Sequence, residues 1–405
     1  MTFEPLRDVR VLDLTSVVVG PVSTWRLAQY GADVIKVESP SGDLMRGLGG
    51  ASPTGQHAGA YLHLNRGKRN ICLDLKHPDA QPAIQRLIAW ADVIVANMRP
   101  DALKRLGLDA ETIRTNAPEK VYCLLTGYGT DGPYAGFPTY DSVVQGATGM
   151  AGLSLQRDGA PAYVPMLVCD HVVGEIAAGT IVAAVLQQKT SGIGASLEIP
   201  MFETMAGFVL QEHLAAQSFD PPVGPAGDQR LLSPYNKPVQ TLDGFISFTI
   251  NTDAQVRAFL EVTGRGALAD DPRFNSVAAR AQNVAQWFEV RGAPLMAHTS
   301  DKWIEILRQA DLAVMPCHTL ETLVEDPHLK SVGLIEFETH PTEGRAASIR
   351  SSVRVNDENL SRRSPSAPRG FDTRDVLAET GFSGQDIESL IASGAAHSSQ
   401  IQTKK

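Results

Sequence analysis

The N-terminal part of the chain alternates short apolar runs with amphipathic segments, and this alternation restricts the fold more than any other feature. The runs VRVLDL at 9–14 and VIKVE at 34–38 are rich in β-branched residues, and the segment 22–30 between them has the apolar spacing of a helix. Two strands joined by a helix form a βαβ unit, in which the strands are parallel and the crossover is right-handed. The sequence therefore predicts a parallel β-sheet.

The same alternation continues as far as residue 125. Strands are predicted at 70–76, 92–97 and 120–125, and helices over 77–90 and after Met98-Arg99-Pro100. Repeated strand and helix are typical of a doubly wound α/β domain. Open sheets of this class bind ligands at the carboxyl ends of their strands. The loop after the first strand, TSVVVGP, is therefore a candidate binding loop.

A glycine-rich segment follows the last of these strands. Residues 127–132, GYGTDG, match the GxGxxG pattern of dinucleotide-binding proteins. That pattern requires a helix N-terminus for the pyrophosphate, whereas Pro133 and the turn-rich residues 134–138 come next. We interpret the segment as a loop that allows close approach of a backbone, and not as an NAD site.

The segment Pro161–Leu186 contains a carboxylate at a predicted change of structure. Asp170 lies where an extended apolar run, 163–168, turns into a helix of small residues, on which Gly174 and Ala178 share one face. The free N–H groups of a helix N-terminus stabilise negative charge. Asp170 is therefore either an N-cap or an ionised nucleophile in a partly dry site, and this segment leaves both interpretations open.

The second half of the chain predicts a smaller domain. A helical pattern over 203–219 is followed by the Pro- and Gly-rich segment 220–227, and residues 235–250 predict a hairpin with its turn at Asp243-Gly244. Further helices are predicted over 253–263, 276–290, 300–309, 373–380 and 384–393, with a strand pattern at 347–355. We expect a large domain of 1–200 completed by 330–405, a linker of 201–228 and a small α+β domain of 229–329.

Charge and cysteine content restrict the possible partners. The net charge of −9 disfavours nucleic acid and anionic membranes as partners. Four cysteines stand far apart without metal-ligand spacing, which indicates a reducing compartment and no metal site. The N-terminus lacks the pattern of a secretion signal, and the apolar run 176–186 is shorter than the ~20 residues that span a bilayer. We expect a cytoplasmic protein.

Several segments, in the same order, resemble the class III CoA-transferase family, which includes formyl-CoA transferase, carnitine CoA-transferase and 2-methylacyl-CoA racemases. The matching segments are DLTSVVVGP, GADVIKVESPSGDLMR, LNRGKRNICLDLK, ADVIVANMRPDALKRLGL, GYGTDGPYAGFPTYDSVVQGATGM, the helix that begins near Asp170, YNKPVQTLDGFISF, DDPRF and FDTRDVLAETGFS. They extend over nearly the whole chain, so a coincidental match is implausible.

The resemblance implies a Rossmann-like large domain with a smaller α+β domain, and a homodimer of interlocked rings. Family members use an aspartate nucleophile, and its position falls on Asp170. The carboxylate would form an aspartyl-acyl anhydride and then an aspartyl-CoA thioester, from which CoA passes to a small carboxylate acceptor. The resemblance implies no permanently bound cofactor, because the CoA thioester is the substrate. Water must be excluded, since both intermediates hydrolyse.

The resemblance also carries over ten positions that contact CoA or lie near the acyl group. These are Val17, Val18, Val19, Tyr61, Leu73, Lys76, Asn97, Met98, Arg105 and Tyr140. The cations Lys76 and Arg105 suit phosphate groups, although either alone is more typical of a solvated surface charge. For the acceptor carboxylate the sequence offers Arg46, His63 and Arg66 without ranking them.

Two departures from formyl-CoA transferase argue against formate and oxalate as substrates. Ser39 stands where that enzyme has an arginine after the second strand, and the segment before Tyr235 lacks its run of glycines. The racemase branch has a histidine directly before the aspartate that is Asp141 here. Tyr140 occupies that position, and a phenol with a pKa of about 10 is a poor base for an α-proton.

Three functions remain as interpretations. His171 is a possible substitute base for a racemase, but adjacent helix residues point about 100° apart. A non-catalytic acyl-CoA-binding protein would retain the fold and use Asp170 only as a cap. We favour CoA transfer over racemisation and over binding alone.

Overall fold

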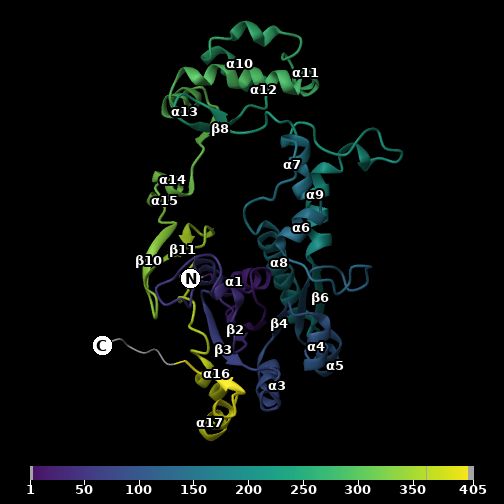
Figure 1. Ribbon diagram of the computed structural model, residues 1–405, viewed down its shortest axis with the longest axis vertical. Coiled ribbons are helices and arrows are strands. Elements are labelled where there is room, and N and C mark those ends of the chain that lie inside the picture. The colour runs from purple at the N-terminus through teal and green to yellow at the C-terminus, as the bar shows by residue number, and fades with distance from the viewer. Residues whose placement is uncertain (1–2, 362, 400–405) are drawn as a thin grey trace. The chain divides into compact units, whose positions relative to one another are not determined.

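The computed structural model describes residues 3–361 and 363–399, which form two compact units (Figure 1). The first unit contains the chain through Thr148, the segment Val164–Gly207 and the chain from His328 onward. The second contains Gly149–Tyr163 and Phe208–Pro327. The segment 149–163, which lies inside the range expected for the large domain, thus groups with the second unit.

A seven-stranded sheet forms the centre of the first unit, in the order β14-β3-β2-β1-β4-β5-β6. Its strands are β1 (Arg10–Leu14), β2 (Asp33–Glu38), β3 (Lys68–Leu73), β4 (Val93–Ala96), β5 (Val121–Thr126), β6 (Ala195–Pro200) and β14 (Ala396–His397). Every neighbouring pair is parallel except β14 with β3. The order 3-2-1-4-5-6 is that of doubly wound sheets, so the predicted α/β fold with a parallel sheet is confirmed.

Helices cover this sheet and bury its apolar side chains. Those of the first unit are α1 (Val19–Gln29), α2 (Gly59–Leu64), α3 (Gln81–Trp90), α4 (Pro100–Leu106), α5 (Ala110–Asn116), α6 (Asp141–Ala147), α8 (Val168–Ser191), α16 (Thr373–Glu379) and α17 (Gly384–Ala392), with 3-10 turns at Leu44–Arg46 and Pro78–Ala80. The core on one side joins Leu12 and Ile94 of the sheet to Ile84 and Leu87 of α3 and to Val376 of α16. The predicted C-terminal helices therefore complete the core of the N-terminal sheet.

Helix α8 packs closely against α1 through the small-residue face that the sequence predicts. A Cβ atom at Gly174 would lie 2.7 Å from the Val19 carbonyl oxygen and 2.7 Å from Val22 Cβ, so a larger residue does not fit without displacement. Arg26 and Glu175 add an ion pair across the same contact, with Nε 2.9 Å from Oε2. This contact fixes the start of α8 relative to the loop that precedes α1.

Among the described residues, α8 alone is long and apolar enough to span a membrane. It is longer than the run 176–186, but half of its most apolar window is buried inside the protein. The core helix of a soluble protein has the same length and composition, so the match is weak evidence of a membrane span.

The chain after residue 327 adds two hairpins to the first unit. Strands β10 (Ile335–His340) and β11 (Gly344–Ile349) pair antiparallel, as do β12 (Arg354–Val355) and β13 (Glu358–Asn359). The strand predicted over 347–355 is divided between β11 and β12. A short helix, α15 (Pro327–Ser331), precedes the first hairpin.

The second unit has a three-stranded antiparallel sheet, β7-β8-β9, with its own core. Its elements are α7 (Met150–Asp158), β7 (Val239–Gln240), β8 (Phe245–Thr249), α10 (Asp253–Val262), α11 (Val277–Gln282), α12 (Val284–Gly292), α13 (Ser300–Gln309), β9 (Ala313–Pro316), α14 (Leu320–Leu323) and 3-10 turns at Ala215–Ser218, Gly266–Asp270 and Ala293–Ala297; helix α9 (Met201–His213) begins in the first unit. The predicted hairpin is confirmed by the pairing of Val239 with Ile246. The predicted helix 276–290 breaks at Asn283.

Candidate active site

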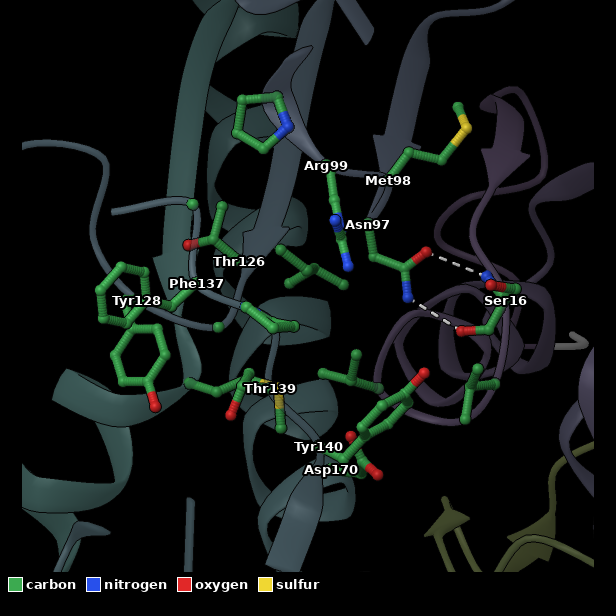
Figure 2. Close-up of a pocket in the computed structure, with 18 of the residues that line it drawn as sticks. Ser16, Asn97, Met98, Arg99, Thr126, Tyr128, Phe137, Thr139, Tyr140 and Asp170 are labelled. Carbon is green, nitrogen blue, oxygen red and sulfur yellow. Dashed lines mark hydrogen bonds between the residues drawn. The ribbon is translucent and has the colours of Figure 1, made fainter. Parts of the chain in front are cut away.

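A cavity of about 250 Å³ lies at the carboxyl ends of β1, β4 and β5 in the first unit (Figure 2). The loops that follow these strands contribute most of its lining, and the loop after β5 is the one that leads into α6. The first turn of α8 and the first residue of α9 complete it. The lining residues are Ser16, Val17, Val19, Asn97, Met98, Arg99, Pro100, Leu125, Thr126, Gly127, Tyr128, Thr130, Gly136, Phe137, Pro138, Thr139, Tyr140, Asp170 and Met201. This is the edge at which doubly wound sheets bind ligands.

The loop after β1 is anchored from both sides. Asn97 accepts a hydrogen bond from the Ser16 N–H at 3.0 Å and donates one to the Ser16 carbonyl at 2.8 Å (Figure 2). The next residue, Val17, has a φ of +71° and donates its N–H to Asp43 Oδ1 at 3.1 Å. Left-handed backbone at a β-branched residue costs about 1–3 kcal/mol, so the anchors must maintain it.

Asp170 is the third residue of α8 and its exposed fraction is 7%. The N-cap position belongs to Leu167, and the side chain that caps the helix is Asp141 of α6. Asp141 Oδ2 accepts the N–H groups of Cys169 at 2.7 Å and of Asp170 at 3.1 Å. The interpretation of Asp170 as an N-cap is therefore wrong, because a carboxylate from another helix fills that role. The Asp170 carboxyl lies at the cavity (Figure 2).

The electrostatic surroundings of Asp170 favour its neutral form. Burial, and secondly the charge of Asp141, raise the pKa of Asp170 to about 7. Asp141 is held in place by Gln145, whose Nε2 donates to Asp141 Oδ1 at 2.6 Å and to the Met166 carbonyl at 3.2 Å. Near neutral pH both the carboxylate and the carboxylic acid of Asp170 are populated, as in many catalytic acids and bases.

The thiol of the neighbouring residue, Cys169, is unreactive at neutral pH. Cys169 is buried, and burial raises the pKa of its thiol to about 12. A neutral thiol is a weak nucleophile at neutral pH. Of the two side chains at this turn, the carboxyl of Asp170 is the one able to attack an electrophile. Within the described ranges, no group of His, Cys, Asp and Glu side chains is arranged to hold a metal ion.

The cavity brings together six of the residues named from the sequence and leaves five outside. Val17, Val19, Asn97, Met98, Tyr140 and Asp170 line it. The other five lie elsewhere: Val18 and Tyr61 in a small buried cluster, Leu73 in the main core, and Lys76 and Arg105 on the exposed surface.

Two of the three side chains suggested for the acceptor carboxylate are already paired with protein carboxylates. Arg46 Nε donates to Glu38 Oε2 at 2.8 Å, and the Tyr61 hydroxyl donates to Glu38 Oε1 at 2.6 Å. Arg66 Nη2 lies 2.9 Å from Glu338 Oε2. The third is His63, whose pKa is lowered by burial. None of the three lines the cavity.

Arg99, which the sequence placed only at the start of a helix, is a basic residue of the cavity that was not among the predicted site residues. Of the described residues that line the cavity, it alone carries a positive charge, and no described carboxylate forms an ion pair with it. Its side chain extends toward the middle of the cavity (Figure 2). It is the third residue after the end of β4, so the rule that ligands bind at carboxyl strand ends is the signal that would have found it.

The glycine-rich segment forms a turn against the cavity, as interpreted from the sequence. A Cβ at Gly127 would lie 2.1 Å from Thr139 Cγ2, so glycine allows this close approach. The Gly129 N–H donates to Glu203 at 2.8 Å, and the next helix begins only at Asp141. The segment thus lacks the helix that a dinucleotide motif requires.

Comparisons with known proteins place this arrangement in a wider group. A family model described as CoA-transferase family III matches residues 6–373. The chain is similar to succinate–glutarate CoA-transferase of Agrobacterium fabrum, with 33% identity over 388 residues that cover 93% of this chain and 95% of that protein. It is 28% identical over 408 residues to succinyl-CoA:glutarate CoA-transferase of Mus musculus, which covers 100% of this chain and 92% of that protein.

A solved structure shares the fold. The crystal structure of a CAIB/BAIF family protein from Brucella suis has a TM-score of 0.79 and 27% identity, and the match covers 94% of this chain and 100% of that one. The sheet that positions the cavity is therefore a feature this chain has in common with that structure.

Proposed function

We propose that this chain, which belongs to CoA-transferase family III, moves CoA from an acyl-CoA thioester to a small carboxylic acid through covalent intermediates on Asp170. The observation that carries the proposal is the position of the Asp170 carboxyl, which lies in the first turn of α8, at the cavity and without a cation partner among the described residues. The relatives named above act, by their names, on succinate and glutarate, and these short carboxylic acids are the substrate class we expect.

Each step exchanges one activated acyl bond for another. The ionised Asp170 oxygen attacks the thioester carbonyl carbon, the C–S bond breaks, and CoA leaves as a thiolate. The thiolate attacks the aspartyl carbonyl of the anhydride, which forms the aspartyl-CoA thioester and releases the donor acid. The acceptor carboxylate then displaces CoA to form a second anhydride, and the returning thiolate takes the acceptor acyl group and regenerates Asp170.

The surroundings of Asp170 support these steps. The group is nearly buried, so water has limited access to intermediates that would otherwise hydrolyse. Its pKa of about 7 keeps a substantial fraction ionised at neutral pH. Asp141 fixes the backbone of the turn that carries the nucleophile. Val17, Asn97 and Met98 line the same cavity and suit the pantetheine chain, while we propose Lys76 and Arg105 for the phosphates.

We propose that Arg99 receives the acceptor carboxylate, because it is the one cation among the described residues that line the cavity and no described carboxylate pairs with it. Replacing it by glutamine (Arg99→Gln) removes a charge-assisted hydrogen bond, which contributes about 1.5–3 kcal/mol. We expect the KM for the acceptor acid to rise at least tenfold. Lys104→Gln removes the same charge from an exposed site on α4, the helix that Arg99 precedes, and serves as the control. Equal effects of the two substitutions would contradict the assignment.

The assembly and location are also proposals. We propose a homodimer of interlocked rings, with a large domain of 1–200 and 330–405, a linker of 201–228 and a small domain of 229–329. The apolar side chains of Ile176 and Leu186, which are 42% and 66% exposed on α8, support a partner surface there. Light scattering after size-exclusion chromatography tests the dimer.

The net charge of −9 supports a protein that does not bind nucleic acid or anionic membranes. We propose a cytoplasmic location.

Trapping with hydroxylamine tests the covalent mechanism. Incubation with succinyl-CoA or acetyl-CoA and hydroxylamine should convert Asp170 to a hydroxamate, which peptide mass spectrometry locates. Exchange of the α-hydrogen of a 2-methylacyl-CoA in deuterated water without a hydroxamate would instead indicate racemisation. Thermal stabilisation by CoA without either reaction would indicate a binding protein.

A further inference from the structure

The segment 33–46, DVIKVESPSGDLMR, contains buried charges that the proposed reaction does not use. Lys36 lies on β2 and Asp43 precedes the 3-10 turn Leu44–Arg46; their exposed fractions are 1% and 5%. Neither lines the cavity. An ion pair removed from water loses hydration that its mutual attraction repays only with good geometry, so its presence here invites a functional explanation.

The two charges hold one loop at two points. Asp43 Oδ2 lies 2.9 Å from Lys36 Nζ, while Asp43 Oδ1 accepts the N–H of Val17 at 3.1 Å. Lys36 Nζ also donates to the carbonyl of Thr15 at 2.7 Å. The ion pair therefore contacts the loop on either side of Ser16, whose own N–H and carbonyl are taken by Asn97.

Val17 is the residue that needs this support. Its φ of +71° lies in the left-handed region, which β-branched residues rarely adopt. Such a conformation persists only where neighbouring groups determine it. The backbone of this loop is also tightly packed, because a Cβ atom at Gly20 would lie 2.2 Å from Thr15 Cβ.

We infer that Asp43, held by Lys36, is a positioning residue that fixes Val17 in its left-handed conformation and thereby shapes the wall of the CoA cavity. The inference rests on the proposed function for the identity of the ligand. Without the pair, Val17 relaxes to negative φ and the wall of the cavity that also contains Asp170 changes shape. The pair thus acts on substrate binding through the backbone and never touches the reacting atoms.

The affinity for CoA itself measures this effect without turnover. Asp43→Ala removes both the acceptor for the Val17 N–H and the partner of Lys36, and we expect the dissociation constant of CoA, measured by calorimetry, to rise about tenfold. Asp43→Asn keeps one acceptor oxygen, so its effect should be smaller. The control Asp253→Asn removes the ion pair of a buried arginine in the second unit, and it should leave CoA affinity unchanged.

A second substitution separates positioning from general destabilisation. Glycine adopts positive φ without strain, so in a Val17→Gly background Asp43→Ala should weaken CoA binding less than about threefold. A crystal structure of the Asp43→Ala variant, which lacks an acceptor for the Val17 N–H, should show Val17 at negative φ. If Val17 keeps its φ there, or if the glycine background leaves the loss of affinity unchanged, the inference is wrong. Absence of an Asp170 hydroxamate would refute the proposed chemistry and leave this inference intact.

Discussion

Two sets of buried carboxylates lie at the same edge of the first unit's sheet and differ in the charges that face them. Asp13 and Glu38 are 0% and 3% exposed. Burial raises the pKa of each, but Lys68 and Lys36 lower that of Asp13 to about 2, and Arg46 lowers that of Glu38 to about 2. Asp170 is buried too, but the charged group that acts on it is the carboxylate of Asp141. Burial and this negative charge raise the pKa of Asp170 to about 7.

The comparison teaches that burial raises the pKa of the carboxyl in both sets, and that the charge of its neighbour decides whether the folded pKa ends above or below the ordinary value. Where a cation is present, as for Asp13 and Glu38, the lowered pKa keeps the carboxylate ionised at neutral pH, and it serves the architecture. Where another carboxylate is present, as Asp141 is for Asp170, the proton is exchangeable near neutral pH. A reactive carboxyl is therefore distinguished here by the cation it lacks among the described residues.

Removal of the Asp170 oxygen nucleophile should have the largest effect. In the Asp170→Asn variant we expect CoA transfer to fall by a factor on the order of 10³ or more, since no step of the covalent route remains. Initial rates with succinyl-CoA measure it, with circular dichroism to verify the fold. The control is Glu175→Gln, an acid on the same helix that pairs with Arg26. Turnover retained within twofold by the asparagine variant would refute the mechanism.

Removal of a cation from the paired set should instead cost stability. Lys36→Met leaves Asp43 buried without its partner, and breaking a buried pair in this way costs about 3–5 kcal/mol of unfolding free energy. Urea unfolding measures the loss. The exposed pair of Arg10 and Asp92 provides the control, because Arg10→Gln should cost less than about 1 kcal/mol. Equal losses would mean that burial does not distinguish the two pairs.

The two sets should also respond to pH in opposite directions. The folded pKa of Asp170 lies above the ordinary 3.8, so its contribution to stability is present below about pH 4 and is lost as pH rises through about 7. Asp170→Asn should therefore be more stable than wild type by about 2–4 kcal/mol at pH 8, and the two should be equal at pH 4. The folded pKa of Glu38 is depressed, so its contribution is present above about pH 4.5 and is lost as pH falls through about 2.

Unfolding of wild type, Asp170→Asn and Glu38→Gln across pH tests this opposition. The Glu38→Gln variant should be less stable than wild type at pH 8 and should approach it toward pH 2. A stability difference of the same sign for both variants at pH 8 would contradict the contrast between paired and unpaired carboxylates.

Sequence patterns were sufficient where structure depends on near neighbours. The β-branched runs at 9–14 and 34–38 became β1 and β2, and Asp243-Gly244 became the turn between β7 and β8. Each of these depends on local propensity and turn chemistry. No pattern indicated β14, whose two residues pair with β3 across most of the chain. Its pairing comes from the hydrogen bonds of a remote strand edge, which local sequence does not encode.

The candidate site also contains residues that local sequence located and residues that depend on tertiary contacts. The change from apolar run to small-residue helix located Asp170, and the resemblance named its chemical role. Asp141 was named only as a neighbour of Tyr140, because its role as the cap of α8 joins two helices that are separated in sequence. Arg46 and Arg66 were candidates for the acceptor carboxylate until the structure showed each paired with a protein carboxylate. Whether a charge is free is a property of tertiary contacts.

The smallest effect expected is that of removing the Asp141 charge alone. Asp141→Asn retains an oxygen that can accept the N–H groups of Cys169 and Asp170, so the turn keeps its cap. Because burial is the larger cause of the raised pKa of Asp170, the rise of kcat/KM with pH should move to lower pH by about one unit and stay above 3.8. The exposed Asp131, which lies in the neighbouring loop, gives the control Asp131→Asn. A pH profile that does not move would show that Asp141 acts on Asp170 through the helix backbone and not through its charge.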